Sequence, residues 1–280
     1  MLERSIRDEI HGLLLEPDLE RKLAWAEALT AQAQAIGDAA AGPSDPTPLR
    51  QISPSRPADF VVLPPHAVPE RGTLHTPEGR YRLMHAVCNI EFSAIELALV
   101  TAADHPAQPA AFHRDWFRVA GEEVRHARLV MGRLEALGGR FGSEPIHLGL
   151  WESAAPYGAL EERLAVVPRI LEARGLDVSA RLRTTLRAAG DPESADLLEL
   201  IYRDEIGHVG TGSTWFRAAC ADQGVEPEAR FLELYARFRA ERGGRPAPLD
   251  REGRLRAGFS ERELQALAPP PGGKLTLSGE

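Results

Sequence analysis

The chain has 280 residues, of which 43% are hydrophobic and 26% are charged, and its net charge is −8. This composition is typical of a globular protein that can bury a large core, as one domain with additions or as two domains. The negative charge argues against a surface that coats nucleic acid. The two cysteines are too few for a disulfide framework or a thiolate metal site.

The sequence gives no sign of a membrane span or a secretory signal. No run of eighteen apolar residues occurs, so no membrane span is expected. The N-terminal residues carry acidic side chains among the apolar ones and lack the apolar core of a signal peptide. We therefore expect a cytoplasmic protein.

The hydrophobic pattern predicts an all-α chain, because apolar residues recur at helical spacing and no stretch alternates as a β-strand does. A proline-rich stretch from Ala41 to Pro77 predicts an extended connector that packs on a core, since its residues 60–63 need burial. The residues after 240 form a Gly/Pro/Arg-rich tail. Helices are expected over residues 5–36 (one or two helices around Pro17), 77–103, 109–137, 157–174, 179–189, 191–221 and 227–240.

Two Glu-x-x-His motifs carry the chemistry that the sequence suggests. They are Glu123-Val-Arg-His126 and Glu205-Ile-Gly-His208, each deep inside a long predicted helix. Residues three apart on a helix point the same way, so each motif offers one carboxylate and one imidazole to a common point. One such motif is weak evidence, but two indicate a metal site with two similar halves.

A two-metal site in a helical bundle also needs one carboxylate from each of the other two helices. Glu172 is the candidate on the third helix, and Glu91 or Glu96 on the first. Glu91 precedes Glu123 by 32 residues and Glu172 precedes Glu205 by 33, whereas Glu96 precedes Glu123 by only 27. The matched spacing favours Glu91 and predicts two similar helix hairpins, with Glu96 as the alternative ligand.

Carboxylates and imidazoles are suitable ligands for two iron ions, and manganese accepts the same ligands. Four buried carboxylates without metal would repel one another and bind protons strongly. Tyr202 and Asp204 lie close to the second motif and are candidates for contacts with the ligands or for lining the pocket. Glu122 is expected on the outer face of its helix.

The chain resembles the ferritin-like superfamily, and more closely an uncharacterised bacterial branch catalogued as domain of unknown function four-five-five. The resemblance implies a di-iron or related di-metal four-helix bundle, with the first ligand at the Glu of a Glu-x-x-Ala pattern, here Glu91 and Ala94. Asn89 departs from the pattern, since a histidine is expected there. The matching stretches are AIELAL (94–99), DWFRVAGEEVRHARLVMGRLEALG (115–138), HLGLWESA (147–154), VVPRILEARGLDV (166–178) and DEIGHVGTGSTWFRAAC (204–220).

The predicted organisation therefore has three parts. N-terminal helices and the proline-rich connector (1–76) pack on a ferritin-like di-metal bundle (77–222), which a C-terminal helix and an extended Arg/Pro/Gly-rich tail (223–280) follow. The tail holds seven arginines that suggest a solvated helix end or, alternatively, a site for an anionic partner. These are Arg237, Arg239, Arg242, Arg245, Arg251, Arg254 and Arg256.

The function predicted first is a non-haem di-iron oxidoreductase that activates O₂ to oxidise or hydroxylate a small-molecule substrate. The long additions on both sides of the bundle favour it over a compact storage ferritin. The alternatives are a non-enzymatic iron-handling protein and a tRNA-modifying hydroxylase, although the net charge disfavours nucleic acid as a partner. A homodimer is compatible with either class.

Overall fold

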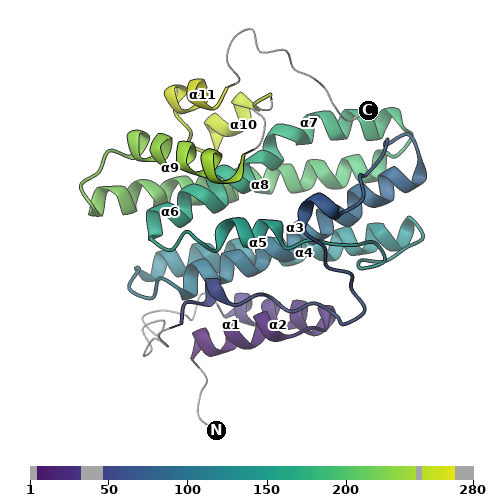
Figure 1. Cartoon of the computed structure of the whole chain (residues 1–280), viewed down its shortest axis with the longest axis horizontal. Helices are drawn as coiled ribbons and strands as arrows, with labels where there is room; N and C mark the ends of the chain where they lie inside the picture. Colours follow the sequence, from purple (N-terminus) through teal and green to yellow (C-terminus); the bar gives the residue numbers. More distant parts are fainter. Residues whose placement is uncertain (1–4, 33–46, 244–247, 269–280) are drawn as a thin grey trace. The chain divides into compact units, whose positions relative to one another are not determined.

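The computed structural model describes residues 5–32, 47–243 and 248–268, and the regular structure within these ranges is helical (Figure 1). The one β-type feature among them is an isolated parallel bridge between Val62 and Ile146. The predicted all-α class is therefore confirmed. The described residues fall into two compact units, one within residues 1–70 and 81–156 and the other within 71–80 and 157–280.

The first unit begins with two short helices whose starts are capped by polar side chains. Ser5 and Asp8 form a reciprocal capping box at the start of α1, and Asp18 caps α2 just after Pro17 has ended the first helix. The expected helical region 5–36 is thus two helices, and residues 33–36 lie outside the described ranges. The elements of this unit are α1 (Ile6–Leu15), α2 (Leu19–Ala31), two 3₁₀ turns (Leu49–Gln51 and Pro65–Ala67), α3 (Pro77–Ala103), α4 (Ala110–Ala136) and α5 (Gly149–Ala154).

Helices α3 and α4 agree closely with the ranges expected from the sequence. An 18-residue window of α3 is apolar and long enough to cross a membrane, although it is not an unbroken apolar run. Since 78% of that window is buried inside the structure, α3 packs as a core helix does. The short helix α5 was not expected from the sequence.

A buried ion-pair cluster ties the N-terminal part of the first unit to α3. Glu96, which is fully buried, accepts hydrogen bonds from Lys22 Nζ at 2.6 Å and from Arg56 Nη1 and Nη2 at 2.6 and 2.8 Å. Burial alone would raise the pKa of Glu96, but Arg56 and Lys22 outweigh it and hold the pKa below its usual value. Glu96 is therefore charged and fully engaged with two cations.

The connector differs from expectation at its apolar run. Phe60 packs edge-on against Phe141, with ring centroids 5.3 Å apart, but Val61 and Val62 are about half exposed. The prediction that the whole run is buried was wrong. The backbone gives the reason, since Val61 and Leu63 pair with Ile146 through their main-chain groups, and this pairing leaves neighbouring side chains at the surface. Residues 41–46 of the expected connector lie outside the described ranges.

The second unit contains the longest helix of the described chain, α8, which starts as the sequence predicts. Asp191 accepts a hydrogen bond from the Ser194 amide as N-cap, and Pro192 occupies the first helical position. In Figure 1, α9 and the short yellow helices gather along α8. The elements of this unit are α6 (Leu160–Leu164), a π-helical segment (Ala165–Glu172), α7 (Ala173–Ala188), α8 (Pro192–Asp222), α9 (Pro227–Arg242), α10 (Arg251–Arg256) and α11 (Glu261–Leu267).

Two expectations for this unit were wrong. The expected break between 174 and 179 does not occur, because the exposed Gly175 continues the helix at a cost of about 1 kcal/mol, which the packing of α7 on α8 offsets. The Gly/Pro/Arg-rich tail contains α10 and α11, each capped by a polar side chain at Asp250 and Ser260. Residues 244–247 and 269–280 of the tail lie outside the described ranges.

Several arginines of the tail form ion pairs within the second unit. Arg254 donates two hydrogen bonds of 2.8 Å to Asp177 and is 3% exposed. Arg237 pairs with Glu162 at 2.8 Å, and Arg251 pairs with Glu261. These arginines serve the packing of the C-terminal helices, and Arg245 lies outside the described residues.

Replacing Glu96 by Gln is expected to destabilise the protein by about 3–5 kcal/mol at pH 7, because two buried cations lose their counter-charge. The matched control is Glu122→Gln, which breaks a solvent-exposed pair with Arg118 and should change stability by less than about 1 kcal/mol. Urea unfolding of both variants measures the difference. Equal losses would show that the Glu96 cluster does not hold the N-terminal helices in place.

Candidate metal centre

Glu123 and His126 lie within the buried stripe of α4. That stripe is mostly apolar, with His113 as a further buried polar residue, and Glu123 and His126 are fully buried in it. Their spacing of three residues puts them on one face of the helix, as predicted. The buried apolar residues of the stripe include Phe112, Trp116, Val119, Ala120, Ala127, Val130 and Leu134.

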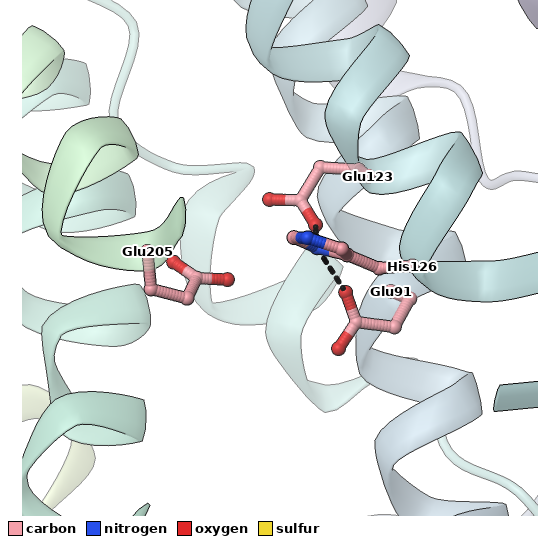
Figure 2. Close-up of side chains that lie close together, drawn as sticks. All are labelled: Glu91, Glu123, His126 and Glu205. Atoms are coloured by element: carbon pink, nitrogen blue, oxygen red, sulfur yellow. Dashed lines mark hydrogen bonds and ion pairs between the residues drawn. The ribbon is translucent and has the colours of Figure 1, made fainter. Parts of the chain in front are cut away.

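Glu91 of α3 completes a three-residue cluster in the first unit, shown in Figure 2. His126 Nδ1 lies 3.1 Å from Glu123 Oε2 and 3.5 Å from Glu91 Oε2, so the imidazole stands between two carboxylates. One possible ligand atom from each of the three residues lies within 4.8 Å of the others. The residues thus form a buried Glu/His cluster that could hold a metal ion.

Burial and mutual interaction shift the proton affinities of this cluster. Burial raises the pKa of Glu91 well above its usual range; the hydrogen bond with His126 lowers it, and the charge of Glu123 raises it further. Burial alone would lower the pKa of His126, but Glu123 and Glu91 raise it to about 11. The pKa values of Glu91 and His126 are therefore both raised, so the cluster favours bound protons when no metal is present.

The second unit repeats the pairing of carboxylate and imidazole on α8. His208 Nδ1 lies 3.7 Å from Glu205 Oε2, and His208 is fully buried. In both motifs, therefore, the Nδ1 atom faces the carboxylate of the glutamate three residues earlier. Glu172 ends the π-helical segment that packs on α8, and its side chain is also buried.

The contrast between Glu91 and Glu96 bears on the choice of ligand on α3. Both are buried, but Glu96 already has two cations and a lowered pKa. Glu91 has a raised pKa, and its Oε2 lies 3.5 Å from Nδ1 of His126. These contacts favour Glu91 as the metal ligand on α3. Glu96 has a structural role as the partner of two buried cations.

The neighbouring candidates have other contacts. The Tyr202 hydroxyl donates a 2.6 Å hydrogen bond to Asp250, and burial together with Asp250 raises its pKa to about 12. This contact does not support a role for Tyr202 at the metal site, and that role stays a prediction. Asp204 is half-buried on α8, and its role also stays a prediction. Asn89, where a histidine was expected, donates to the main-chain oxygen of His147 and holds the loop before α5.

Sequence reasoning missed the cations that neutralise Glu96 and the π-helical segment that carries Glu172. Lys22 and Arg56 lie 74 and 40 residues from Glu96 along the chain, so no local sequence pattern predicts that they pair with it. Pro168 was a signal for an irregular helix, since a proline inside a helix removes a main-chain hydrogen bond.

The donor set of the first cluster fits a hard or borderline divalent ion such as Fe²⁺ or Mn²⁺. Two carboxylates and one imidazole are ligands that such ions accept, and a buried group with a raised pKa can exchange its proton for a metal. The buried Oε2 of Glu91, 3.5 Å from His126 Nδ1, is one of the carboxylate atoms that a bound cation would stabilise.

The described chain is thus an all-helical protein with a buried Glu/His cluster that could hold a metal. Residues 15–265 match the model of the family described as "Protein of unknown function (DUF455)", and the chain belongs to this family. It is similar to an uncharacterized protein of Haemophilus influenzae, with 37% identity over 214 residues that cover 73% of each chain. No solved structure matches the chain.

Binding of a divalent ion at the first cluster should release protons at pH 7, because the pKa values of Glu91 and His126 are both raised. The affinity should accordingly increase with pH. Titration of the metal-free protein with Mn²⁺ in weak buffer with a pH indicator measures the release. Glu91→Gln should release fewer protons, and binding without proton release would contradict the raised proton affinity of the cluster.

Proposed function

We propose a single site for two iron ions, so that the chain is a di-metal carboxylate protein of ferritin-like type. Two sets of three ligands, here called the first and the second triad, would form this site. The observation that carries this proposal is the buried cluster of Glu91, Glu123 and His126, with its raised pKa values and its position on two helices. The six proposed ligands are Glu91, Glu123 and His126 in the first unit and Glu172, Glu205 and His208 in the second.

The internal repeat supports the joining of the two triads. Each contains a Glu-x-x-His motif with Nδ1 facing the carboxylate, and each motif follows a further glutamate at nearly equal distance along the chain. Four carboxylates and two neutral imidazoles match the charge of two divalent ions. In a bundle of this kind, ligands from four helices project inward to a common centre.

We further propose that the protein is an oxidoreductase that uses O₂ and a small-molecule substrate in the cytoplasm. Two iron ions, when bound, supply redox equivalents and open positions for O₂ or substrate. The protein's part is to hold the ions in a dry interior and to keep the imidazoles oriented. Manganese is the alternative metal, and a homodimer is compatible with the proposal.

The alternative of an iron-handling protein uses the same ligands. A tRNA-modifying hydroxylase has less support, because several arginines of the tail are engaged in ion pairs. Arg254 is buried, so its replacement would disturb the fold rather than report on RNA binding.

Glu123→Ala and Glu205→Ala should each reduce bound iron to about half of the wild-type content, because each removes a ligand from one triad. The iron-loaded variants should also lose the stabilisation that bound metal gives, about 3 kcal/mol at a free metal concentration 100 times the dissociation constant. Glu122→Ala, on the same helix but paired with Arg118, should change neither quantity. Elemental analysis and thermal unfolding test this, and equal behaviour of all three variants would contradict the ligand assignment.

The oxidoreductase and the iron-handling function differ in stoichiometry and assembly. The reduced, iron-loaded protein should hold two ions per chain and change its visible absorbance when O₂ is added. A cage-like oligomer with many iron atoms per chain would instead favour iron handling. Size-exclusion chromatography with iron analysis, followed by stopped-flow absorbance, separates the two.

A further inference from the structure

Arg169 occupies an unusual environment in the second unit. It is 2% exposed, and its guanidinium group lies over three aromatic rings, at 4.8 Å from the centroid of Phe216, 4.2 Å from Phe231 and 4.5 Å from Phe259. Such contacts are favourable for a cation that has lost its water. The aromatic cage is built by α8, by α9 and by the residues that follow α10.

The polar contacts of Arg169 are equally specific. Its Nη2 atom lies 2.8 Å from both carboxylate oxygens of Glu263 on α11, and its Nε atom donates to Ser213 Oγ on α8 at 3.2 Å. A buried arginine needs a counter-charge, and Glu263 supplies it. The side chain is thus held by groups from three helices.

Arg169 belongs to the π-helical segment that ends at Glu172. This segment also approaches α8 closely at Pro168, because a methyl group on Gly212 would lie 2.2 Å from the Pro168 ring. π-helical turns are rare and less stable than α-helical ones, so a segment of this kind persists where its surroundings hold it. The contacts of Arg169 and the close approach at Gly212 are such restraints.

The contacts of Arg169 connect the segment that carries Glu172 with α8, the helix that carries Glu205 and His208. Arg169 precedes Glu172 by three residues, and Ser213 follows His208 by five residues on α8. The hydrogen bond and the aromatic contacts to α8 therefore fix the segment that carries Glu172 against the helix that carries Glu205 and His208. A shift of this segment would move the Glu172 carboxylate relative to the other two ligands.

We propose that Arg169 is a positioning residue for the metal site: clamped by Glu263 and the three phenylalanines, it holds the π-helical segment so that Glu172 is presented to the ion bound by Glu205 and His208. This inference rests on the proposed function. It also gives the C-terminal helices a role, since α9 and α11 supply Phe231 and Glu263. Residues that act through a ligand in this way typically change metal affinity by about 10- to 100-fold.

The test compares Glu263→Gln with Asp177→Asn in the full-length chain. Asp177 pairs with the buried Arg254 at 2.8 Å and links α10 to α7, so both changes replace a buried carboxylate by an amide among the C-terminal helices. Of these two changes, only Glu263→Gln removes a direct polar contact of Arg169. Ser213→Ala is a milder second variant, because it removes one hydrogen bond to Arg169 and leaves the buried ion pair in place.

Titration of each metal-free protein with Co²⁺, followed by ligand-field absorption, gives the affinity and coordination of each ion. The wild type and Asp177→Asn should bind two ions alike. Glu263→Gln should bind one ion normally and the other about 10- to 100-fold more weakly, with an altered spectrum, and Ser213→Ala should show a smaller effect in the same direction. Thermal unfolding should show comparable destabilisation by the two acid-to-amide changes.

Three outcomes would overturn the inference, and they are distinguishable. Wild-type affinities and spectra in both Glu263→Gln and Ser213→Ala would remove the positioning role while leaving the metal site intact. Equal weakening in Asp177→Asn would show a general loosening of the C-terminal helices. Absence of Co²⁺ binding by the wild type would reject the proposed function itself.

Discussion

Two glutamates on α3, five residues apart, are both buried and have opposite electrostatic environments. Glu96 is neutralised by Lys22 and Arg56, so its pKa is lowered and its charge serves to join the N-terminal helices to α3. Glu91 shares a buried site with Glu123, and its pKa is raised. Burial of carboxylates without sufficient positive charge is unfavourable, and protons or metal ions must supply what the protein does not.

This constraint relates the candidate centre to the rest of the fold. Helix α4 places Glu123 and His126 in a stripe that apolar residues would otherwise fill, and the surrounding packing keeps water away from them. The same motif recurs on α8 with the same pairing of atoms. Each unit thus buries a Glu/His pair where apolar side chains would be more favourable. We propose that a shared metal site explains why both pairs are present.

Local features could be predicted from the sequence, and long-range ones could not. The Glu-x-x-His pairs were identifiable because helical spacing alone sets the relation between residues three apart. The start of α8 followed from Asp191 and Pro192 for the same reason. The counter-charges of Glu96 come from distant residues that only the folded chain brings close. Gly175 was misjudged as a helix end because tertiary packing overrides the weak preference of an exposed glycine.

The most direct measurement of the central claim is anomalous X-ray diffraction at the iron absorption edge from crystals grown with Fe²⁺. We expect two iron peaks per chain, one beside His126 and one beside His208, with Glu91, Glu123, Glu172 and Glu205 as the carboxylate ligands. Iron bound at surface groups alone, or no iron at either histidine, would contradict the claim that the buried acidic residues exist to hold metal.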